Sequence, residues 1–446
     1  MDRRSFIKAG MAGLGVAMWS PLAFGKSKTS LGHVVIIGAG FGGATAAKYL
    51  RMWSDGRVSV TVIEPRPKFI SCPVSNRILS GMADLQTVTH AYEPLQESYG
   101  IRFISGIATR IDPVRKRVQV GANQIQYDRL IIATGIDFDY STLPMITADI
   151  QASTIPHAWK AGTQTLLLKE QIAAMPDGGV AAITIPMVPY RCPPGPYERA
   201  CQIAFYLKRH KPKSKLLVLD ANPAITSKRP LFERAWNEFY QNIIEYYPSS
   251  AIENLDVKAL SVTTTFGRHK VDVLNLIPPQ TAGRLALDTG LGNSTKRWCD
   301  VNVLNYESKI ITGIHVLGDS VSSVPPKSAH VATSQAKVCA NAIIAELAGE
   351  EVDPSPVFAN TCYSYVDDKQ AVHVANVYRY DSKNKEMQAA PGGGISAAPS
   401  LEEGAQADVW AANIWADVLS SSRNAEHRKS FGARNKVEAN RSFLPR

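Results

Sequence analysis

The sequence lacks three features that would each settle part of its function. Past the amino terminus, no apolar run reaches the roughly 20 residues that cross a bilayer, which argues against a transmembrane anchor. Cys-x-x-Cys-His is absent, so the chain has no attachment site for a c-type haem of its own. The middle of the chain has no Gly-x-Gly-x-x-Gly turn, which argues against a nicotinamide dinucleotide there.

The amino terminus has the pattern of an export signal. Arg3 and Arg4 precede a weakly apolar stretch from Ala9 to Phe24, and Ala23-Phe-Gly25 is compatible with cleavage. This pattern predicts a twin-arginine signal peptide over residues 1–25 and a periplasmic protein that takes up its cofactor before export. An ordinary signal peptide or a short membrane anchor is the alternative.

The formal net charge is +10, and part of the excess lies at the carboxyl end. Seven Lys and Arg residues lie between Arg423 and Arg446, against Glu426 and Glu438. We expect residues 421–446 to form a basic solvated tail. An exported protein meets no genome, so nucleic acid is not the expected partner; an acidic protein or an anionic lipid is the alternative.

A dinucleotide fingerprint lies near the start of the expected mature chain. An apolar strand-like run from His33 to Ile37 leads into a glycine turn and a helix-like run. Gly38, Gly40 and Gly43 have the spacing that lets the backbone approach a pyrophosphate at a helix N-terminus. The next strand-like run ends at Glu64, the position of an acid that holds the adenosine ribose.

Two later segments favour FAD over NAD at this fingerprint. Residues 127–135, ending in Thr134 and Gly135, resemble the strand that closes the FAD domain of flavoproteins with two dinucleotide-binding domains. Residues 314–319, ending in Gly318 and Asp319, resemble their second FAD motif. The resemblance implies that Asp319 bonds the ribityl chain.

The middle of the chain predicts a second βαβ unit with an altered turn. A strand-like run (Gly179 to Ile185), a helix-like run (Tyr197 to Arg209) and a second strand (Lys215 to Asp220) follow one another. The turn between the first two carries prolines and Cys192 instead of glycines. It therefore predicts thiol chemistry in place of NAD(P) binding.

Three cysteine-bearing segments carry a family resemblance. Ser71-Cys-Pro-Val-Ser-Asn76, Tyr190-Arg-Cys-Pro-Pro-Gly-Pro-Tyr-Glu-Arg199 and the run from Pro326 to Cys339 resemble the flavoprotein subunit of flavocytochrome c sulfide dehydrogenase. That family is related to sulfide:quinone oxidoreductase. The resemblance runs from about the end of the leader to about residue 415.

The resemblance implies an α/β fold, a tandem Rossmann-like flavoprotein with two dinucleotide-binding domains and a small C-terminal α+β interface domain. The FAD-binding domain is expected over residues 32–145 and 290–350. The second Rossmann-like domain is expected over 146–289, and the interface domain over 351–420.

The resemblance also implies roles for single residues. Cys72 is expected to bond the flavin through a thioether, and Cys192 and Cys339 to form a redox disulfide beside the flavin. Glu198 is a candidate base for hydrogen sulfide, with an ordinary first-turn helix carboxylate as the alternative. The expected cofactor-binding residues are Gly38, Gly40, Gly43, Glu64, Cys72, Thr134, Gly135, Gly318, Asp319 and Lys337.

Other cysteines and lysines have less context. Cys201, Cys299 and Cys362 are expected to be core or incidental thiols, although spacing alone does not choose among the possible pairings, Cys192 with Cys201 included. Lys327 and Lys337 are candidates for stabilising an anionic flavin or attracting HS⁻; solvated surface lysines are the alternative.

The function implied is sulfide oxidation through the disulfide and FAD, with electrons passed to a c-type cytochrome subunit that carries the haem. One alternative is a sulfide:quinone oxidoreductase, which calls for an apolar C-terminal anchor, whereas Trp415 is followed by polar and charged residues. A second alternative is a noncatalytic thiol-exchange flavoprotein of a sulfur-oxidising complex.

Overall fold

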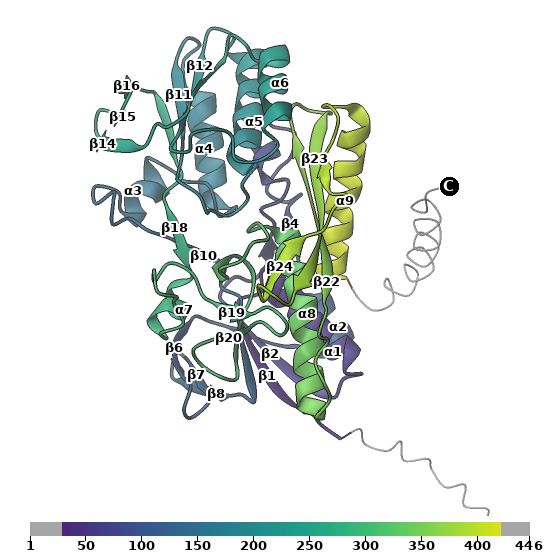
Figure 1. The fold of residues 1–446 in the computed structure, drawn as a ribbon. Helices are drawn as coiled ribbons and strands as arrows, with labels where there is room; N and C mark the ends of the chain where they lie inside the picture. The colour runs from purple at the N-terminus through teal and green to yellow at the C-terminus, as the bar shows by residue number, and fades with distance from the viewer. Residues whose placement is uncertain (1–28, 421–446) are drawn as a thin grey trace, which may run out of the picture.

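The computed structural model describes residues 29–420, as two Rossmann-like domains and a C-terminal sheet (Figure 1). The predicted signal peptide and the predicted basic tail lie outside the described residues. Within the described range, no helix is both long and apolar enough to cross a membrane.

The first domain is built on a seven-stranded sheet in the order β19-β20-β21-β9-β1-β2-β5. Its core strands β21, β9, β1, β2 and β5 run parallel. The strands are β1 (Gly32–Ile37), β2 (Val58–Glu64), β5 (Arg102–Ser105), β9 (Arg129–Ile132), β19 (Val301–Asn302), β20 (Glu307–Ser308) and β21 (Ile314–Val316).

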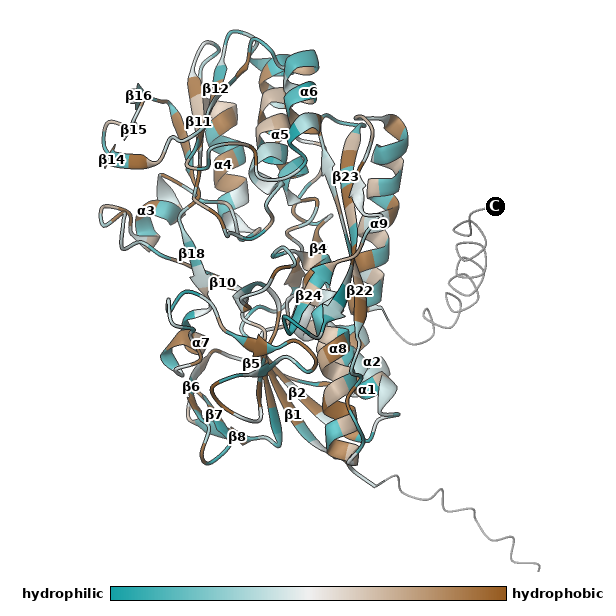
Figure 2. Cartoon of the chain, viewed as in Figure 1, coloured by the Kyte–Doolittle hydropathy of each residue, from teal (hydrophilic) through white to brown (hydrophobic). Residues whose placement is uncertain are grey.

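Burial of apolar and small residues accounts for how the central strand and the helices of this domain pack. In β1, residues Val34 to Ile37 are all buried, as expected of a central strand covered on both faces. Small residues of α1 (Phe41–Trp53) let that helix pack closely against α8 (Ala329–Ala348). Figure 2 shows the resulting hydrophobic band along the lower strands and α8.

Shorter elements surround this sheet. They are β3 (Phe69–Ile70), η1 (Ser75–Ile78), β4 (Thr89–His90), α2 (Glu93–Tyr99), β6 (Ala108–Asp112), β7 (Arg117–Val120), β8 (Asn123–Gln126), α7 (Arg284–Asp288) and η2 (Gly318–Ser320).

The second domain has a four-stranded parallel sheet, β13-β12-β11-β17, joined to the first domain through the antiparallel ribbon β10–β18. Its elements are β10 (Ile136–Phe138), α3 (Ala148–Ser153), α4 (Thr163–Ala174), β11 (Val180–Ile185), α5 (Gly195–His210), β12 (Lys215–Asp220), α6 (Arg229–Phe239), β13 (Ile244–Tyr247), β14 (Ile252–Asp256), β15 (Ser261–Thr264), β16 (Gly267–Lys270), β17 (Val273–Leu276) and β18 (Gln280–Ala282).

The C-terminal part is an antiparallel sheet with one long helix. It consists of β22 (Val357–Tyr365), β23 (Ala371–Asp381), β24 (Glu386–Ala389), β25 (Gly394–Ile395) and α9 (Leu401–Leu419). The helix begins at Ser400, whose hydroxyl accepts a hydrogen bond from the Glu403 amide. It packs across β22 and β23 and reaches α1, beside which it is drawn in Figure 1.

Candidate functional site

The turn after β1 has the geometry of a dinucleotide cradle. Gly38 has φ of +93°, and a Cβ there would lie 2.7 Å from the Ala133 carbonyl oxygen. A Cβ on Gly43 would collide with the Gly38 carbonyl. At Gly40 a Cβ would meet nothing within 4 Å, so open space lies in front of the α1 N-terminus. Backbone amides there are available to a pyrophosphate.

Two orphaned polar atoms show that these residues fit a flavin dinucleotide. Asp319 Oδ1 and Thr134 Oγ1 are buried and have no hydrogen-bond partner within the described structure. Buried polar atoms are normally paired, so both are acceptors or donors available to a bound ribityl chain or ring. Burial raises the pKa of Asp319. Glu64 is already oriented, since its carboxylate accepts the Ala39 amide at 2.8 Å.

The Cys72 loop contacts the second domain. The Cys72 thiol lies 3.9 Å from the Trp159 carbonyl oxygen, which also accepts a hydrogen bond from Arg191. Asn76 donates to the Gly195 carbonyl at 3.2 Å and to Glu198 at 3.0 Å. These bonds bring the loop of Cys72 against the start of α5, beside the Cys192 turn.

Cys192 is held in an unusual backbone conformation. Its φ is +57°, a left-handed value that is uncommon outside glycine and clusters at functional sites. The Cys192 amide donates to the Lys327 carbonyl at 2.7 Å, and the Cys192 carbonyl accepts the Gly195 amide at 2.8 Å. The turn therefore connects α5 to the segment immediately before α8.

β22, which carries Cys362, is hydrogen-bonded to residues at the start of α8. Ser328 donates to Asn360 at 2.8 Å, and the Thr361 amide donates to His330 Nδ1 at 2.9 Å. These contacts place the Cys362 thiol within hydrogen-bonding reach of the Cys192 thiol. The structure therefore forms a dithiol from Cys192 and Cys362.

The structure does not bring Cys339, the predicted disulfide partner, to Cys192. Cys192 is fastened beside the first turn of α8, whereas Cys339 lies roughly 15 Å further along that helix, at about 1.5 Å per residue. Cys339 is fully buried, and the polar groups near it are those of Tyr306, Glu307 and Glu346. It is a core thiol, the role expected for Cys362.

Lys337, an expected cofactor-binding residue, lies at the contact between α8 and α9. Its ammonium forms an ion pair with Asp417 of α9 at 2.7 Å and lies over the Tyr49 ring, with Nζ 4.9 Å from the centroid. The side chain thus fastens α9 to α8 and α1. Lys327, by contrast, is buried, lies over the Trp298 ring at 3.6 Å, and has its pKa lowered to about 8 by burial.

The pKa values of the two thiols are shifted in opposite directions by their surroundings. The hydrogen bond with Cys192 and the nearby Lys228 ammonium lower the pKa of Cys362 to about 7. The pKa of Cys192 is raised, by the hydrogen bond with Cys362 and by burial. Burial also raises the pKa of Glu198, whose carboxylate accepts bonds from Asn76 and from the Tyr365 amide at 3.0 Å. Glu198 is thus a neighbour of the dithiol that can hold a proton.

In the second domain, the acid that would hold the ribose of a nicotinamide dinucleotide is hydrogen-bonded to other side chains of the chain itself. Asp220 ends β12, where an acid would hold a ribose. Its carboxylate instead accepts the hydroxyls of Tyr197 at 2.8 Å and Tyr246 at 3.0 Å, and the Asn222 side chain at 2.7 Å. Both the turn and the acid are therefore committed to internal contacts.

Sequence reasoning missed Cys362 and Lys228. Cys362 lies in the expected interface domain and was expected to be a core or incidental thiol. The strand character of its segment was the available signal, since a strand can present a thiol at a domain interface. Nothing local marks Lys228, which reaches the dithiol from the N-terminus of α6 only through the tertiary fold.

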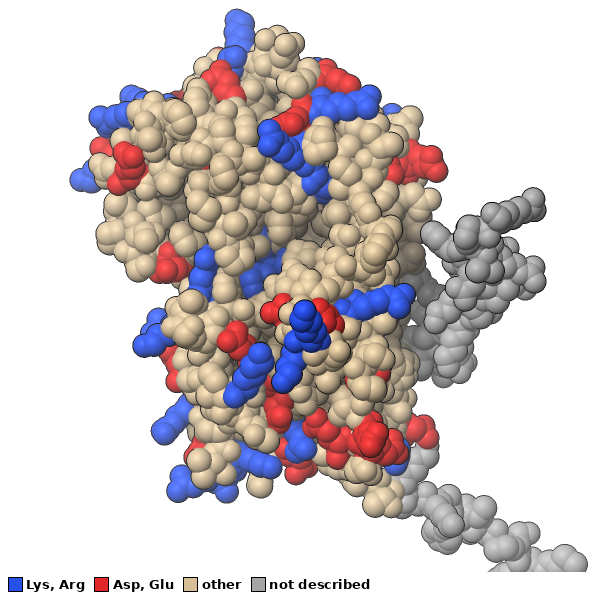
Figure 3. Space-filling view, in the orientation of Figure 1, with Lys and Arg blue, Asp and Glu red and all other residues tan. Residues whose placement is uncertain are grey.

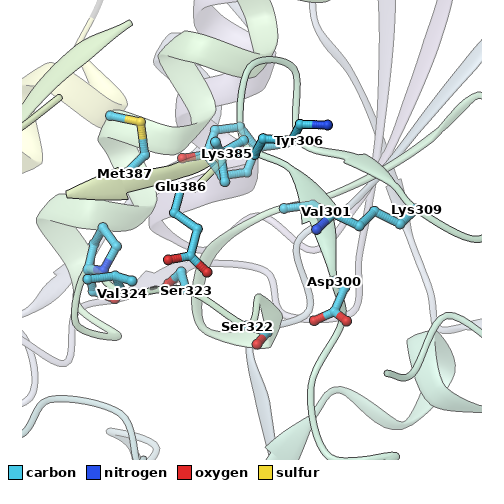
Figure 4. Close-up of a pocket in the computed structure, with 12 residues that line it drawn as sticks. Asp300, Val301, Tyr306, Lys309, Ser322, Ser323, Val324, Lys385, Glu386 and Met387 are labelled. Carbon is cyan, nitrogen blue, oxygen red and sulfur yellow. Dashed lines mark hydrogen bonds between the residues drawn. The ribbon is translucent and has the colours of Figure 1, made fainter. Parts of the chain in front are cut away.

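Two hollows are visible at the surface. Between the upper and lower parts of the molecule, basic side chains lie within a depression (Figure 3). A separate pocket of about 190 Å³ is lined by segments 300–309, 322–325 and 385–387 (Figure 4). The lining of this pocket includes Asp300, Lys309 and Glu386 and contains no cysteine, so the thiol chemistry lies elsewhere.

Three family models match consecutive parts of the chain. Residues 32–160 match the pyridine nucleotide-disulphide oxidoreductase family. Residues 165–278 match the central domain of the flavoprotein chain of sulfide dehydrogenase (flavocytochrome c). Residues 354–419 match the flavin-binding domain of flavocytochrome c sulphide dehydrogenase.

Similar proteins point the same way. A sulfide dehydrogenase (flavocytochrome c) flavoprotein chain from Chlorobaculum thiosulfatiphilum is 53% identical over 46 residues, 10% of this chain and 94% of that one. A mitochondrial sulfide:quinone oxidoreductase from Dictyostelium discoideum is 22% identical over 74% of this chain and 75% of its own. The structure of the Aquifex aeolicus sulfide:quinone oxidoreductase has the same fold, with a TM-score of 0.69, 19% identity and coverage of 90% and 95%.

Proposed function

Because the chain belongs to the family of flavoprotein chains of flavocytochrome c sulfide dehydrogenase, we propose that it is the FAD-containing subunit of a periplasmic sulfide dehydrogenase that passes electrons to a c-type cytochrome. The observation that carries the proposal is the juxtaposition of the Cys192 and Cys362 thiols beside Glu198. A dithiol at this place substitutes for the nicotinamide that other two-dinucleotide flavoproteins use as electron donor.

The reaction begins with the oxidised, disulfide form of this pair. HS⁻ attacks one sulfur, forms a new S–S bond, and releases the other cysteine as a thiolate that carries the electron pair of the broken bond. Glu198, with its raised pKa, accepts the proton when hydrogen sulfide is the attacking species. A second HS⁻ then attacks the outer sulfur of this persulfide, carries it away as HSS⁻ and leaves both cysteines reduced. FAD, when bound, would supply the acceptor for the two electrons released when the two cysteines re-form their disulfide.

The cofactor and the electron acceptor complete the proposal. Gly38, Gly40, Gly43 and Glu64 hold the dinucleotide, Thr134, Gly135, Gly318 and Asp319 meet the ribityl chain and ring, and Cys72 attaches the flavin covalently. A covalent cofactor suits an exported enzyme, because a lost flavin is not replaced outside the cytoplasm. Haem resides on the cytochrome subunit.

The second candidate, a sulfide:quinone oxidoreductase, is favoured by the breadth of the similarity to that group, which extends over most of the chain. The two candidates share the dithiol and differ in the acceptor. Cytochrome c and a water-soluble quinone, each offered to the sulfide-reduced protein, therefore distinguish them.

Anaerobic stopped-flow spectroscopy tests the proposal. Micromolar sulfide is expected to bleach the flavin band of the purified protein, and cytochrome c is expected to restore it. A flavin that stays oxidised with sulfide rules out the dehydrogenase, and reoxidation by quinone but not by cytochrome c selects the second candidate.

A further inference from the structure

Lys228 is a buried lysine beside the dithiol whose charge has no close carboxylate partner among the residues described. It is only 5% exposed, at the N-terminus of α6. Its ammonium donates to the Cys362 carbonyl at 3.1 Å, to Ser364 Oγ at 2.8 Å and to the Val372 carbonyl at 3.5 Å. All three acceptors are neutral. Removing an ammonium from water is unfavourable unless an anion compensates for it.

The backbone also holds Lys228 in place. Its φ is +54°, in the left-handed region that is strained for a non-glycine residue. The three hydrogen bonds connect the second domain to β22 and β23. A residue kept in strain, buried, and connected to the backbone of a redox cysteine is poised to act on that cysteine.

The charged groups around Lys228 come from four elements. They are Cys362 of β22, Glu198 of α5, Cys192 of the turn before α5, and Glu403 of α9. Glu198 accepts hydrogen bonds from Asn76 and Tyr365, and Glu403 is paired with His373 at 2.6 Å. The dithiol is therefore the site where negative charge can appear beside Lys228 during turnover.

We propose that Lys228 is a positioning residue that stabilises the Cys362 thiolate electrostatically. This inference rests on the proposed function for its catalytic meaning. When the Cys192–Cys362 bond is broken by HS⁻, the cysteine nearer the ammonium is the better leaving group, because a thiolate that is stabilised leaves faster. Lys228 thus favours Cys362 as the thiolate released.

Thiol alkylation tests Lys228 without any need for sulfide turnover. The FAD-loaded protein is reduced anaerobically and treated with iodoacetamide between pH 5 and 9, and the Cys362 peptide is quantified by mass spectrometry. In Lys228→Met and Lys228→Gln the Cys362 rate at pH 7 is expected to fall about fivefold, the loss of thiolate that a one-unit rise of a pKa near 7 produces at that pH. Lys228→Arg, which keeps the charge, is expected to stay within about twofold of wild type.

Lys211→Met is the matched control, because Lys211 is also partly buried and donates to a carbonyl, that of Met175, away from the dithiol. Its Cys362 rate is expected to equal that of wild type. A purely structural Lys228 would lower the melting temperature of the neutral variants without moving the alkylation profile. A wild-type profile in FAD-loaded Lys228→Gln therefore overturns the proposal.

Ser364→Ala decides the question if neither neutral variant folds. It removes one neutral acceptor from the ammonium, so the Cys362 rate at pH 7 is expected to rise, and an unchanged or lower rate contradicts the role of Lys228. Failure of wild type to react with sulfide would instead refute the proposed function, while the alkylation comparison would still report on Lys228.

Discussion

The Cys192 thiol lies next to the Cys362 thiol across the junction between the second domain and the C-terminal sheet. Cys192 reaches this position from a turn with left-handed φ, and Cys362 from the interior of β22. Both positions depend on one short segment: the Lys327 carbonyl holds Cys192, while Ser328 and His330 hold β22. The reactive pair is therefore assembled around the start of α8.

We predict that Cys362→Ser abolishes flavin bleaching by sulfide while FAD remains bound, because the exchange reaction loses one of its two sulfurs. Cys339→Ser is the control: it retains bleaching and loses about 1–3 kcal/mol of stability, since a hydroxyl is buried where a thiol was. Stopped-flow spectra and urea unfolding measure the two effects. Bleaching at the wild-type rate in Cys362→Ser would contradict the dithiol assignment.

We predict that the flavin is covalently bound to Cys72, motivated by the approach of its loop to the Cys192 turn. After acid precipitation the yellow colour should stay in the pellet, and the tryptic peptide with Cys72 should carry the mass of the flavin. Cys72→Ala should release FAD on precipitation. A colourless pellet from wild type, together with an unmodified Cys72 peptide, would refute the thioether.

NADH should fail to reduce the flavin, because the Asp220 carboxylate is occupied by Tyr197 and Tyr246. Asp220→Ala should leave NADH inactive and lower the free energy of unfolding by about 2–3 kcal/mol, since buried hydroxyls lose a charged acceptor. Anaerobic spectra with NADH and urea titrations measure these outcomes. Rapid flavin reduction by NADH would show that the second domain binds the nucleotide after all.

His157 should make the fold sensitive to acid. Burial lowers its pKa to about 3, and its Nδ1 accepts the Trp159 amide at 2.8 Å. Between about pH 6.5 and 3 the unfolded chain binds a proton that the folded chain does not, so stability falls as pH decreases, by up to about 1.4 kcal/mol per pH unit. Urea unfolding at several pH values should show a smaller slope in His157→Gln and no such change for exposed His210→Gln.

Asp417 should fasten the end of α9 to the FAD domain. Burial alone would raise the pKa of this carboxyl, but the Lys337 ammonium and the Tyr49 hydroxyl lower it. Because the ion pair is about one-third exposed, Asp417→Asn is expected to cost only about 1 kcal/mol. Asp288→Asn, which removes an exposed pair with Arg284, should cost less than about 0.5 kcal/mol. Equal losses in the two variants would argue against this role of Asp417.

The sequence by itself was sufficient for the fold class, which the structure and the comparisons confirm. The glycine turn at Gly38 to Gly43 depends on steric contacts between residues close in the chain, and the buried strand β1 on its own apolar run. The absence of a second glycine turn was equally local. Such features are encoded within a few residues, and a single sequence is enough to interpret them.

Only the tertiary structure decided which thiol faces Cys192. Cys339 lies between Val338 and Ala340, and Cys362 between Thr361 and Tyr363. Nothing in either segment states which side of a helix or strand will meet the turn. The choice depends on where β22 packs against α8, through Ser328–Asn360 and His330–Thr361, and on the distance that α8 places between its first turn and Cys339. The same reason explains why Lys337, expected at the cofactor, pairs with Asp417 instead, while Lys228 lies beside the dithiol. The direction of a long side chain is set by the elements packed around it.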